Sequence, residues 1–176
     1  MNEIPMIHVD SSSPLLKKEG MFFKEFPSDI RQLRYFTLLI VQKAPPDIRE
    51  VNLLEQQISE LIKNAIKHGN RMDLSKKVRV WFFFSHAEAR VIVNDEGEGF
   101  KDIEKWNEFN RLRIRCFLER NFEEMSKYVS YRTESSDELD GGNALFAALE
   151  YWDGGVVYDE ARTTVGVLKI FTRKGF

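Results

Sequence analysis

The longest regular pattern in this chain is an amphipathic helix that the sequence predicts from about residue 47 to residue 68. Apolar side chains recur there every three or four positions, which is the period of a helix that buries one face. Gly69 follows the last apolar residue, and we expect it to end the helix in the left-handed conformation that glycine adopts readily. The apolar positions are Ile48, Val51, Leu54, Ile58, Leu61, Ile62, Ala65 and Ile66.

A polar pair lies beside this apolar face, because Glu60 and Asn64 are one helical turn apart. A carboxylate can accept a proton from a hydroxyl group, and an amide oxygen can bind Mg²⁺. If the pair faces a cleft, it therefore suits phosphate chemistry. Taken alone, such a pair is more often two surface residues, so the rest of the chain must supply the other parts of a site.

The remaining pattern predicts one α/β domain over residues 21–176. We expect an α+β two-layer sandwich, in which a mixed, mainly antiparallel sheet carries its helices on one face. With 43% apolar residues, a chain of 176 residues can bury one continuous core. Residues 1–20 show no periodicity and are expected to be a mobile tail or a loosely attached edge. Strands are predicted at 21–26, 77–85, 89–94, 156–158 and 163–172, and helices at 29–43, 101–127 and 144–151.

The charge balance excludes some classes of partner. The chain has 26 basic and 28 acidic side chains, so no basic field favours direct nucleic-acid binding or attachment to a membrane surface. Cys116 is the only cysteine, the first residues lack a signal-peptide pattern, and no apolar run approaches the ~20 residues of a membrane span. We therefore expect a cytoplasmic protein with no transmembrane segment.

Two glycine-rich loops follow the predicted helix in the sequence. The segment Asp95–Phe100, D-E-G-E-G-F, comes directly after a predicted strand, and its glycines indicate unusual dihedral angles or a close backbone approach. Gly141 and Gly142 precede a short predicted helix, where free N–H groups and the helix dipole can receive phosphate. Each loop alone is often only a turn or a connector. The three features together, in this order and on these elements, are much harder to obtain by chance.

This set of motifs resembles the GHKL superfamily of ATP-binding domains, and within it the bacterial anti-sigma factor serine/threonine kinases, the switch-protein kinases. E-L-I-K-N-A-I-K-H-G at 60–69 is similar to their N box, and V-N-D-E-G-E-G-F at 93–100 to their first glycine box. G-G-N-A-L-F at 141–146 resembles a variant of the second glycine box, and T-T-V-G-V at 163–167 a strand that closes the adenine pocket. The resemblance spans about residues 21–171 and implies the GHKL fold, with a long helical lid at about 101–140.

The resemblance implies a role for each matching residue. Glu60 would act as general base, Asn64 would bind Mg²⁺, and Asp95 would accept a hydrogen bond from the adenine amino group. Lys67 and His68 would contact the phosphates, although a histidine at a helix end is also a common cap for the helix dipole. The other residues implied in ATP binding are Gly97, Gly99, Phe100, Gly141, Gly142, Asn143, Ala144, Leu145 and Thr164.

The implied function is an ATP- and Mg²⁺-dependent serine/threonine protein kinase that acts as an anti-sigma factor. It would bind a sigma factor, phosphorylate a STAS-type anti-sigma factor antagonist and so regulate transcription by partner switching. The resemblance leaves open whether the chain forms a homodimer. In the second glycine box, Ala144 stands where the family has glycine, and its methyl group occupies space near the phosphates. This departure and the long lid favour an alternative, a catalytically weakened or inactive GHKL-fold module that sequesters a protein partner. A detached catalytic domain of a histidine kinase is a third reading.

Overall fold

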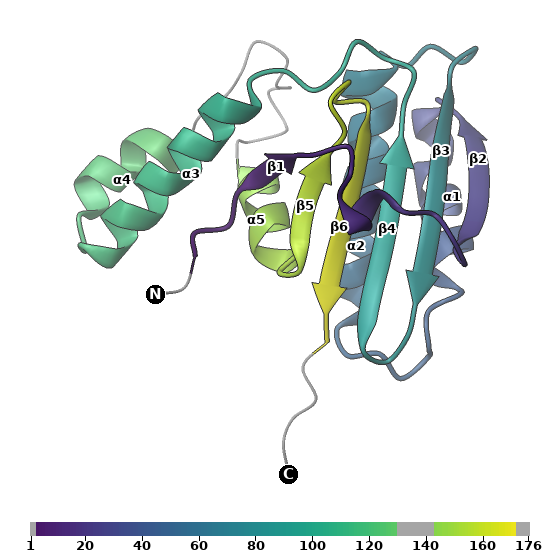
Figure 1. Ribbon diagram of the computed structural model, residues 1–176, viewed down its shortest axis with the longest axis horizontal. Coiled ribbons are helices and arrows are strands. Elements are labelled where there is room, and N and C mark those ends of the chain that lie inside the picture. Colours follow the sequence, from purple (N-terminus) through teal and green to yellow (C-terminus); the bar gives the residue numbers. More distant parts are fainter. Residues whose placement is uncertain (1–2, 130–142, 172–176) are drawn as a thin grey trace.

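A six-stranded mixed sheet forms the centre of the computed structural model, which describes residues 3–129 and 143–171. The strand order is β1-β5-β6-β4-β3-β2, and all neighbours are antiparallel except β1 and β5 (Figure 1). The predicted α+β architecture with a mixed, mainly antiparallel sheet is confirmed. The strands are β1 (Ile7–Val9), β2 (Phe22–Pro27), β3 (Lys77–Phe84), β4 (Glu88–Asn94), β5 (Gly155–Tyr158) and β6 (Thr164–Ile170).

Three of the α-helices lie against one face of the sheet, namely α1 (Leu33–Val41), α2 (Val51–Asn64) and α5 (Asn143–Tyr151) (Figure 1). A 3₁₀ turn, η2 (Ile30–Gln32), leads into α1, and a π-helical turn, η3 (Ala65–Gly69), continues α2. The helices α3 (Ile103–Leu118) and α4 (Phe122–Val129) project beyond the β1 edge of the sheet (Figure 1). The described part of the predicted lid is therefore a helical pair beside the sheet.

The core lies between α2 and the central strands. Leu54, Ile58, Ile62 and Ile66 recur every four residues and are fully buried. On β3 the alternate residues Val78, Val80 and Phe82 are fully buried, whereas the residues between them are partly exposed. The apolar faces of the helix and the strand therefore pack against each other. Burying each large aliphatic side chain there contributes about 1.5–3 kcal/mol to the free energy of folding. This packing holds α2 on the sheet.

The N-terminal segment differs from the expected tail. Residues Ile7–Val9 form β1, which pairs in parallel with β5, and Ile7 is buried. The chain then crosses the face of the sheet opposite the helices through a 3₁₀ turn, η1 (Pro14–Leu16), where Arg90 donates a hydrogen bond to the Pro14 carbonyl at 3.0 Å. A strand of three residues is too short to show periodicity, so the sequence pattern did not reveal it.

Side-chain amides of α3 attach this helix to β1. The Asn107 Oδ1 accepts the Ile7 N–H at 2.7 Å, and the Asn107 Nδ2 donates to the Ile7 carbonyl at 2.8 Å. Asn110 donates to the Pro5 carbonyl at 2.6 Å in the same way. One asparagine thus pairs with both backbone groups of a strand residue, as a neighbouring strand would. The outer edge of β1 is therefore closed by a helix.

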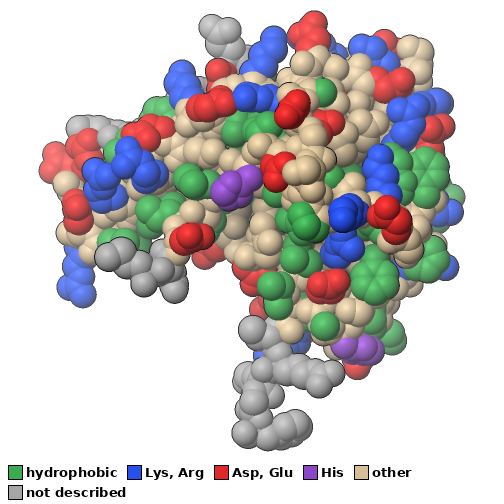
Figure 2. All heavy atoms as spheres, in the orientation of Figure 1, with side chains coloured by type: hydrophobic (Ala, Val, Ile, Leu, Met, Phe, Trp, Pro, Cys, Tyr) green, Lys and Arg blue, Asp and Glu red, His purple; other side chains and the backbone are tan. Residues whose placement is uncertain are grey.

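The surface on the η1 side of the sheet carries interspersed charges. Figure 2 shows acidic and basic side chains alternating over this face, without a broad area of one sign. Among the described residues, none of the helices combines the length and apolar character that a membrane span requires.

Replacing Asn107 with alanine is expected to loosen β1. The Ile7 N–H and carbonyl lose their partners, so we expect the free energy of unfolding to fall by about 1–3 kcal/mol. The matched control is Asn52→Ala on the exposed side of α2, which should change stability by less than about 0.5 kcal/mol. Urea unfolding gives both values, and hydrogen exchange at the Ile7 amide reports the local effect. Unchanged protection of that amide in Asn107→Ala would contradict the clamp.

Candidate functional site

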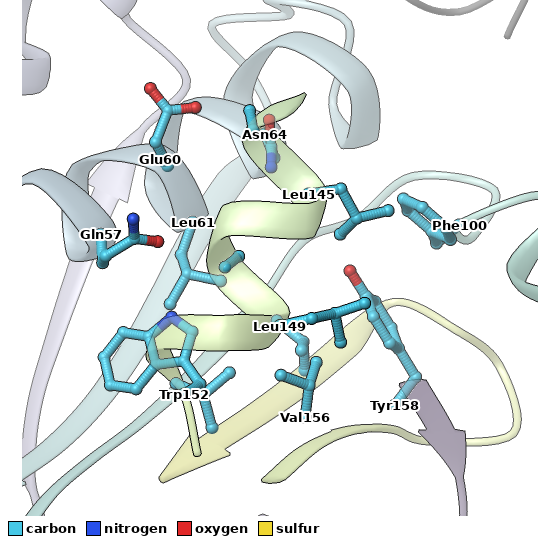
Figure 3. A pocket seen from close by; sticks show the side chains of 14 residues that line it. Gln57, Glu60, Leu61, Asn64, Phe100, Leu145, Leu149, Trp152, Val156 and Tyr158 are labelled. Atoms are coloured by element: carbon cyan, nitrogen blue, oxygen red, sulfur yellow. The ribbon is translucent and has the colours of Figure 1, made fainter. Parts of the chain in front are cut away.

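A pocket opens between α2 and α5, above the ends of β5 and β6 (Figure 3). The empty space between its walls, open solvent included, is about 490 Å³, but only about 30 Å³ is wide enough to take the centre of a water molecule. Four α2 residues spaced by one turn or less face it, so the inward edge of this helix forms one wall. The lining consists of Gln57, Glu60, Leu61, Asn64, Phe100, Ala144, Leu145, Ala148, Leu149, Trp152, Val156, Tyr158, Val165 and Val167.

The polar pair on α2 lies at one end of this pocket (Figure 3). The Lys63 ammonium is 3.0 Å from the Glu60 Oε1, and the Glu60 side chain retains 29% exposure. The carboxylate is therefore paired and still accessible. Asn64, one turn further, is exposed at the same end. The structure thus brings an accessible carboxylate and an accessible amide to one cleft.

The end of α2 differs from the sequence prediction. Gly69 does not end the helix in a left-handed conformation; that backbone region is adopted by Arg71 (φ 52°) and Met72 (φ 60°). Instead the helix widens into η3, and the Asn70 N–H donates to the Ala65 carbonyl at 2.8 Å. Gly69 lies against the Asp95 side chain, where an added Cβ would overlap the carboxyl group. Glycine is needed there for a close approach.

The loop after β4 uses its glycines in two different ways. The Asp95 Oδ1 accepts the Gly97 N–H at 2.8 Å, which folds the loop back on itself. A Cβ at Gly97 would overlap the Gly69 carbonyl, so this glycine permits contact between the two segments. Gly99 has a φ of +97°, a backbone conformation that favours glycine. The Phe100 N–H then donates to the Arg162 carbonyl at 2.8 Å, which returns the chain to the β5–β6 turn.

Asn70 is a buried connector that the sequence analysis missed. It is 0% exposed, and its Nδ2 donates to the Ser28 Oγ and to the Lys77 carbonyl, each at 2.9 Å. Its Oδ1 accepts the Glu96 N–H at 2.7 Å. One amide therefore ties the end of η3 to the loop after β4. No sequence signal marks it, because an asparagine after a glycine has the composition of an ordinary turn.

Burial changes the proton affinity of two groups near this loop. It raises the pKa of the Asp95 carboxyl to about 6, and the nearby Asp159 carboxylate acts in the same direction, while the hydrogen bond from Gly97 opposes both. Burial also raises the pKa of the Tyr158 hydroxyl, whose ring lies 5.3 Å from that of Phe100. Asp95 is therefore a partly buried carboxylate, and a ligand N–H or N–H₂ donor can stabilise its charge.

The structure arranges the predicted site residues in two adjoining groups. The first lines the pocket, and the second surrounds the carboxyl end of β4, where Asn94 donates to the Thr164 Oγ1 at 2.9 Å. Lys67 and His68 lie in η3, between the groups. Gly141 and Gly142 lie outside the described residues, and Asn143 opens α5. The first group is Glu60, Asn64, Phe100, Ala144 and Leu145; the second is Asp95, Gly97, Gly99 and Thr164.

Residues 101–126 of the predicted lid do not line the pocket. Trp106 of α3 instead packs edge-on against Phe146 of α5, with ring centroids 5.5 Å apart.

Among the described residues, no group of three or more His, Cys, Asp or Glu side chains is placed to hold a metal ion. Neither the models of known protein families nor the curated proteins include a match to this chain.

The contact between Gly69 and Asp95 can be tested by a double-mutant cycle. Gly69→Ala should lower the free energy of unfolding by about 1–3 kcal/mol, because its methyl group overlaps the carboxyl group. In an Asp95→Ala background the same change should be neutral or stabilising, since the overlapping atoms are gone and alanine restricts the unfolded chain. Denaturant unfolding of the four proteins gives the coupling. Equal costs in both backgrounds would contradict the contact.

Stability should depend on pH through Asp95. Its carboxyl has a pKa of about 6 in the folded protein, against about 3.9 in an unfolded chain. The folded state therefore holds the proton more tightly, and this contribution to the free energy of unfolding is greatest at low pH. It should decline as the pH rises from about 4 to about 6 and then stay constant. The measurement is the stability difference between wild type and Asp95→Asn by urea unfolding; a difference independent of pH would refute it.

Proposed function

We propose that this chain binds ATP with Mg²⁺ in the α2–α5 cleft and transfers the terminal phosphoryl group to a serine or threonine of a protein. The observation that carries the proposal is the placement of Glu60 and Asn64 in one pocket, with Asp95 held against the end of the same helix by Gly69. The two residues proposed to act on the phosphates and the carboxylate proposed to bind adenine are thereby positioned by the same helix. The proposal also rests on the resemblance to the GHKL anti-sigma factor kinases.

Each of the two groups of site residues offers chemistry that suits one part of the nucleotide. The Asn64 amide oxygen is a hard oxygen donor, and Mg²⁺ commonly completes its octahedron with phosphates and water. The ion, when bound, neutralises charge on the phosphates. At the other group, the Asp95 carboxylate can accept the adenine amino hydrogen, while Gly97 and Gly99 let the loop pack against the Gly69 and Ala161 carbonyls.

Phosphoryl transfer requires mostly positioning from the protein. Glu60 accepts the proton of the attacking hydroxyl group while the new O–P bond forms and the bond to the leaving ADP breaks. Lys63 orients the carboxylate through the ion pair at 3.0 Å. The proposed partners are a sigma factor and a STAS-type antagonist that carries the phosphorylated residue, in the cytoplasm, with the chain acting alone or as a homodimer.

A second candidate function is a binding module with the same fold and little or no turnover. Ala144 favours it, because this residue lines the pocket at the first turn of α5, and its methyl group narrows the space where the family has glycine. The helical pair α3 and α4, which projects beyond the sheet edge, offers additional surface for a protein partner (Figure 1). Such a module would hold its partner without phosphorylating it.

Two substitutions separate binding from chemistry. Asn64→Ala should weaken binding of ATP with Mg²⁺ by tenfold or more in calorimetry, since the ion loses its protein ligand, while Asn52→Ala on the same helix should leave the affinity unchanged. Glu60→Gln should retain binding and lower phosphotransfer by about 10²–10⁴-fold, the usual contribution of a general base. Phosphotransfer is followed by mass spectrometry on a serine-bearing STAS-type antagonist.

The outcomes assign the function. A wild-type protein that does not bind ATP with Mg²⁺, or an Asn64→Ala variant that binds it equally well, would refute nucleotide binding in this cleft. Binding without phosphotransfer would favour the non-catalytic module. In that case, restoring glycine with Ala144→Gly should increase the affinity for nucleotide if the methyl group is the obstacle.

A further inference from the structure

Two buried polar atoms at the inner end of the pocket have no hydrogen-bond partner among the described residues. They are the side-chain carbonyl oxygen of Gln57 and the indole N–H of Trp152, and both side chains line the pocket. Gln57 is 6% exposed and Trp152 is 1% exposed. Leaving a buried donor or acceptor unpaired costs about 1–3 kcal/mol. The pocket therefore offers a bound molecule one hydrogen-bond donor, the indole N–H, and one acceptor, the carbonyl oxygen.

The backbone fixes both side chains in place. Gln57 lies on the inward face of α2, directly before the fully buried Ile58. Trp152 follows the last residue of α5, and its backbone N–H donates to the Ala148 carbonyl at 2.9 Å. The next turn is closed by a hydrogen bond from the Gly154 N–H to the Leu168 carbonyl at 2.9 Å, at a position where an added Cβ would overlap the Leu168 side chain. Both side chains are shielded from solvent where they lie.

The chemistry of this inner end differs from that of the outer end. Figure 3 shows Gln57 and Trp152 on the side of the pocket away from Phe100. The side chains around them are aliphatic, and the one ionisable group of α2 in the lining, Glu60, lies further along the helix. A phosphate or another ion would lose its hydration here without a charged partner. The inner end therefore suits an uncharged occupant. The aliphatic lining residues are Leu61, Leu149, Val156 and Val167.

We propose that the inner end of the α2–α5 pocket is a separate binding site for a small uncharged molecule with an apolar body and a hydroxyl or primary amide group. The polar group of the ligand donates to the Gln57 Oε1 and accepts from the Trp152 Nε1–H, and its apolar body lies between α2 and α5, with α5 moving outward to admit it. The site does not require nucleotide. Its occupant contacts the helix that carries Glu60 and Asn64, so it can influence the outer end.

The test uses the full chain without nucleotide and benzyl alcohol as the probe, with toluene as its apolar counterpart. The chain has three tryptophans, so its ¹H–¹⁵N spectrum has three indole signals. Trp152→Phe assigns one of them; if that variant does not fold, Trp81→Phe and Trp106→Phe assign it by elimination. We expect benzyl alcohol to shift the Trp152 signal saturably, and to bind about tenfold more tightly than toluene because it satisfies the polar pair.

Matched variants locate the site. Gln57→Leu should weaken benzyl alcohol binding about tenfold and leave toluene unaffected, whereas Gln56→Leu, at the exposed neighbouring position, should change neither. Ala148→Leu fills the pocket without altering either polar group and should abolish binding of both probes. Absence of a saturable shift, equal affinity for the two probes, or equal alcohol binding in Gln57→Leu would overturn the proposal. So would a long-lived water at the Trp152 indole that the alcohol does not displace.

Discussion

The arrangement of the candidate site depends on one contact, the approach of the Asp95 carboxyl group to the backbone of Gly69. This contact joins the end of α2 to the end of β4, two elements distant in the sequence. It requires glycine at position 69, because any side chain there would meet the Asp95 carboxyl group. It also requires glycine at position 97, because the loop after β4 packs there against the Gly69 carbonyl. Burial of Asp95 follows from it, and with that burial comes the raised pKa. Asn70 joins the same two segments by accepting the Glu96 N–H, and its amide also donates to the Ser28 hydroxyl and the Lys77 carbonyl.

The sequence predicted the elements well where a long period repeats, and poorly where a contact depends on a neighbour distant in the chain. Residues 54, 58, 62 and 66 are fully buried as their spacing predicts. Gly69 was singled out for the wrong reason: its neighbour Asp95 is invisible in the sequence, and a glycine after a helix most often indicates a left-handed stop. The three-residue β1 carries too few positions for a period, and only the amide of Asn107 reveals how it is held.

The same distinction applies within the pocket. Glu60 and Asn64 could be proposed from the sequence because their spacing places them on one side of a helix, beside the apolar stripe. Gln57 escaped notice because it lies within that stripe, where a single polar residue does not change the period. Trp152 is a large apolar residue and is buried in the core, so nothing in the sequence indicates that its indole N–H lacks a partner. Unpaired polar atoms become visible only when the surrounding elements are in place.

The two ends of the pocket therefore differ in how water and charge reach them, although one helix serves both. At Asn64 the wall is exposed and polar, and charge can be neutralised by ions from solvent. At Gln57 the wall is closed by α5 and Trp152, and only hydrogen bonds can compensate a polar group. α5 is held on its outer side by ring contacts to α3, which is itself tied to β1 by side-chain amides. Each of these hydrogen bonds contributes only about 0.5–1.5 kcal/mol, whereas α2 is held by a row of fully buried aliphatic side chains. A change in how α3 sits on β1 would reach the pocket through α5, while α2 stays fixed by the core.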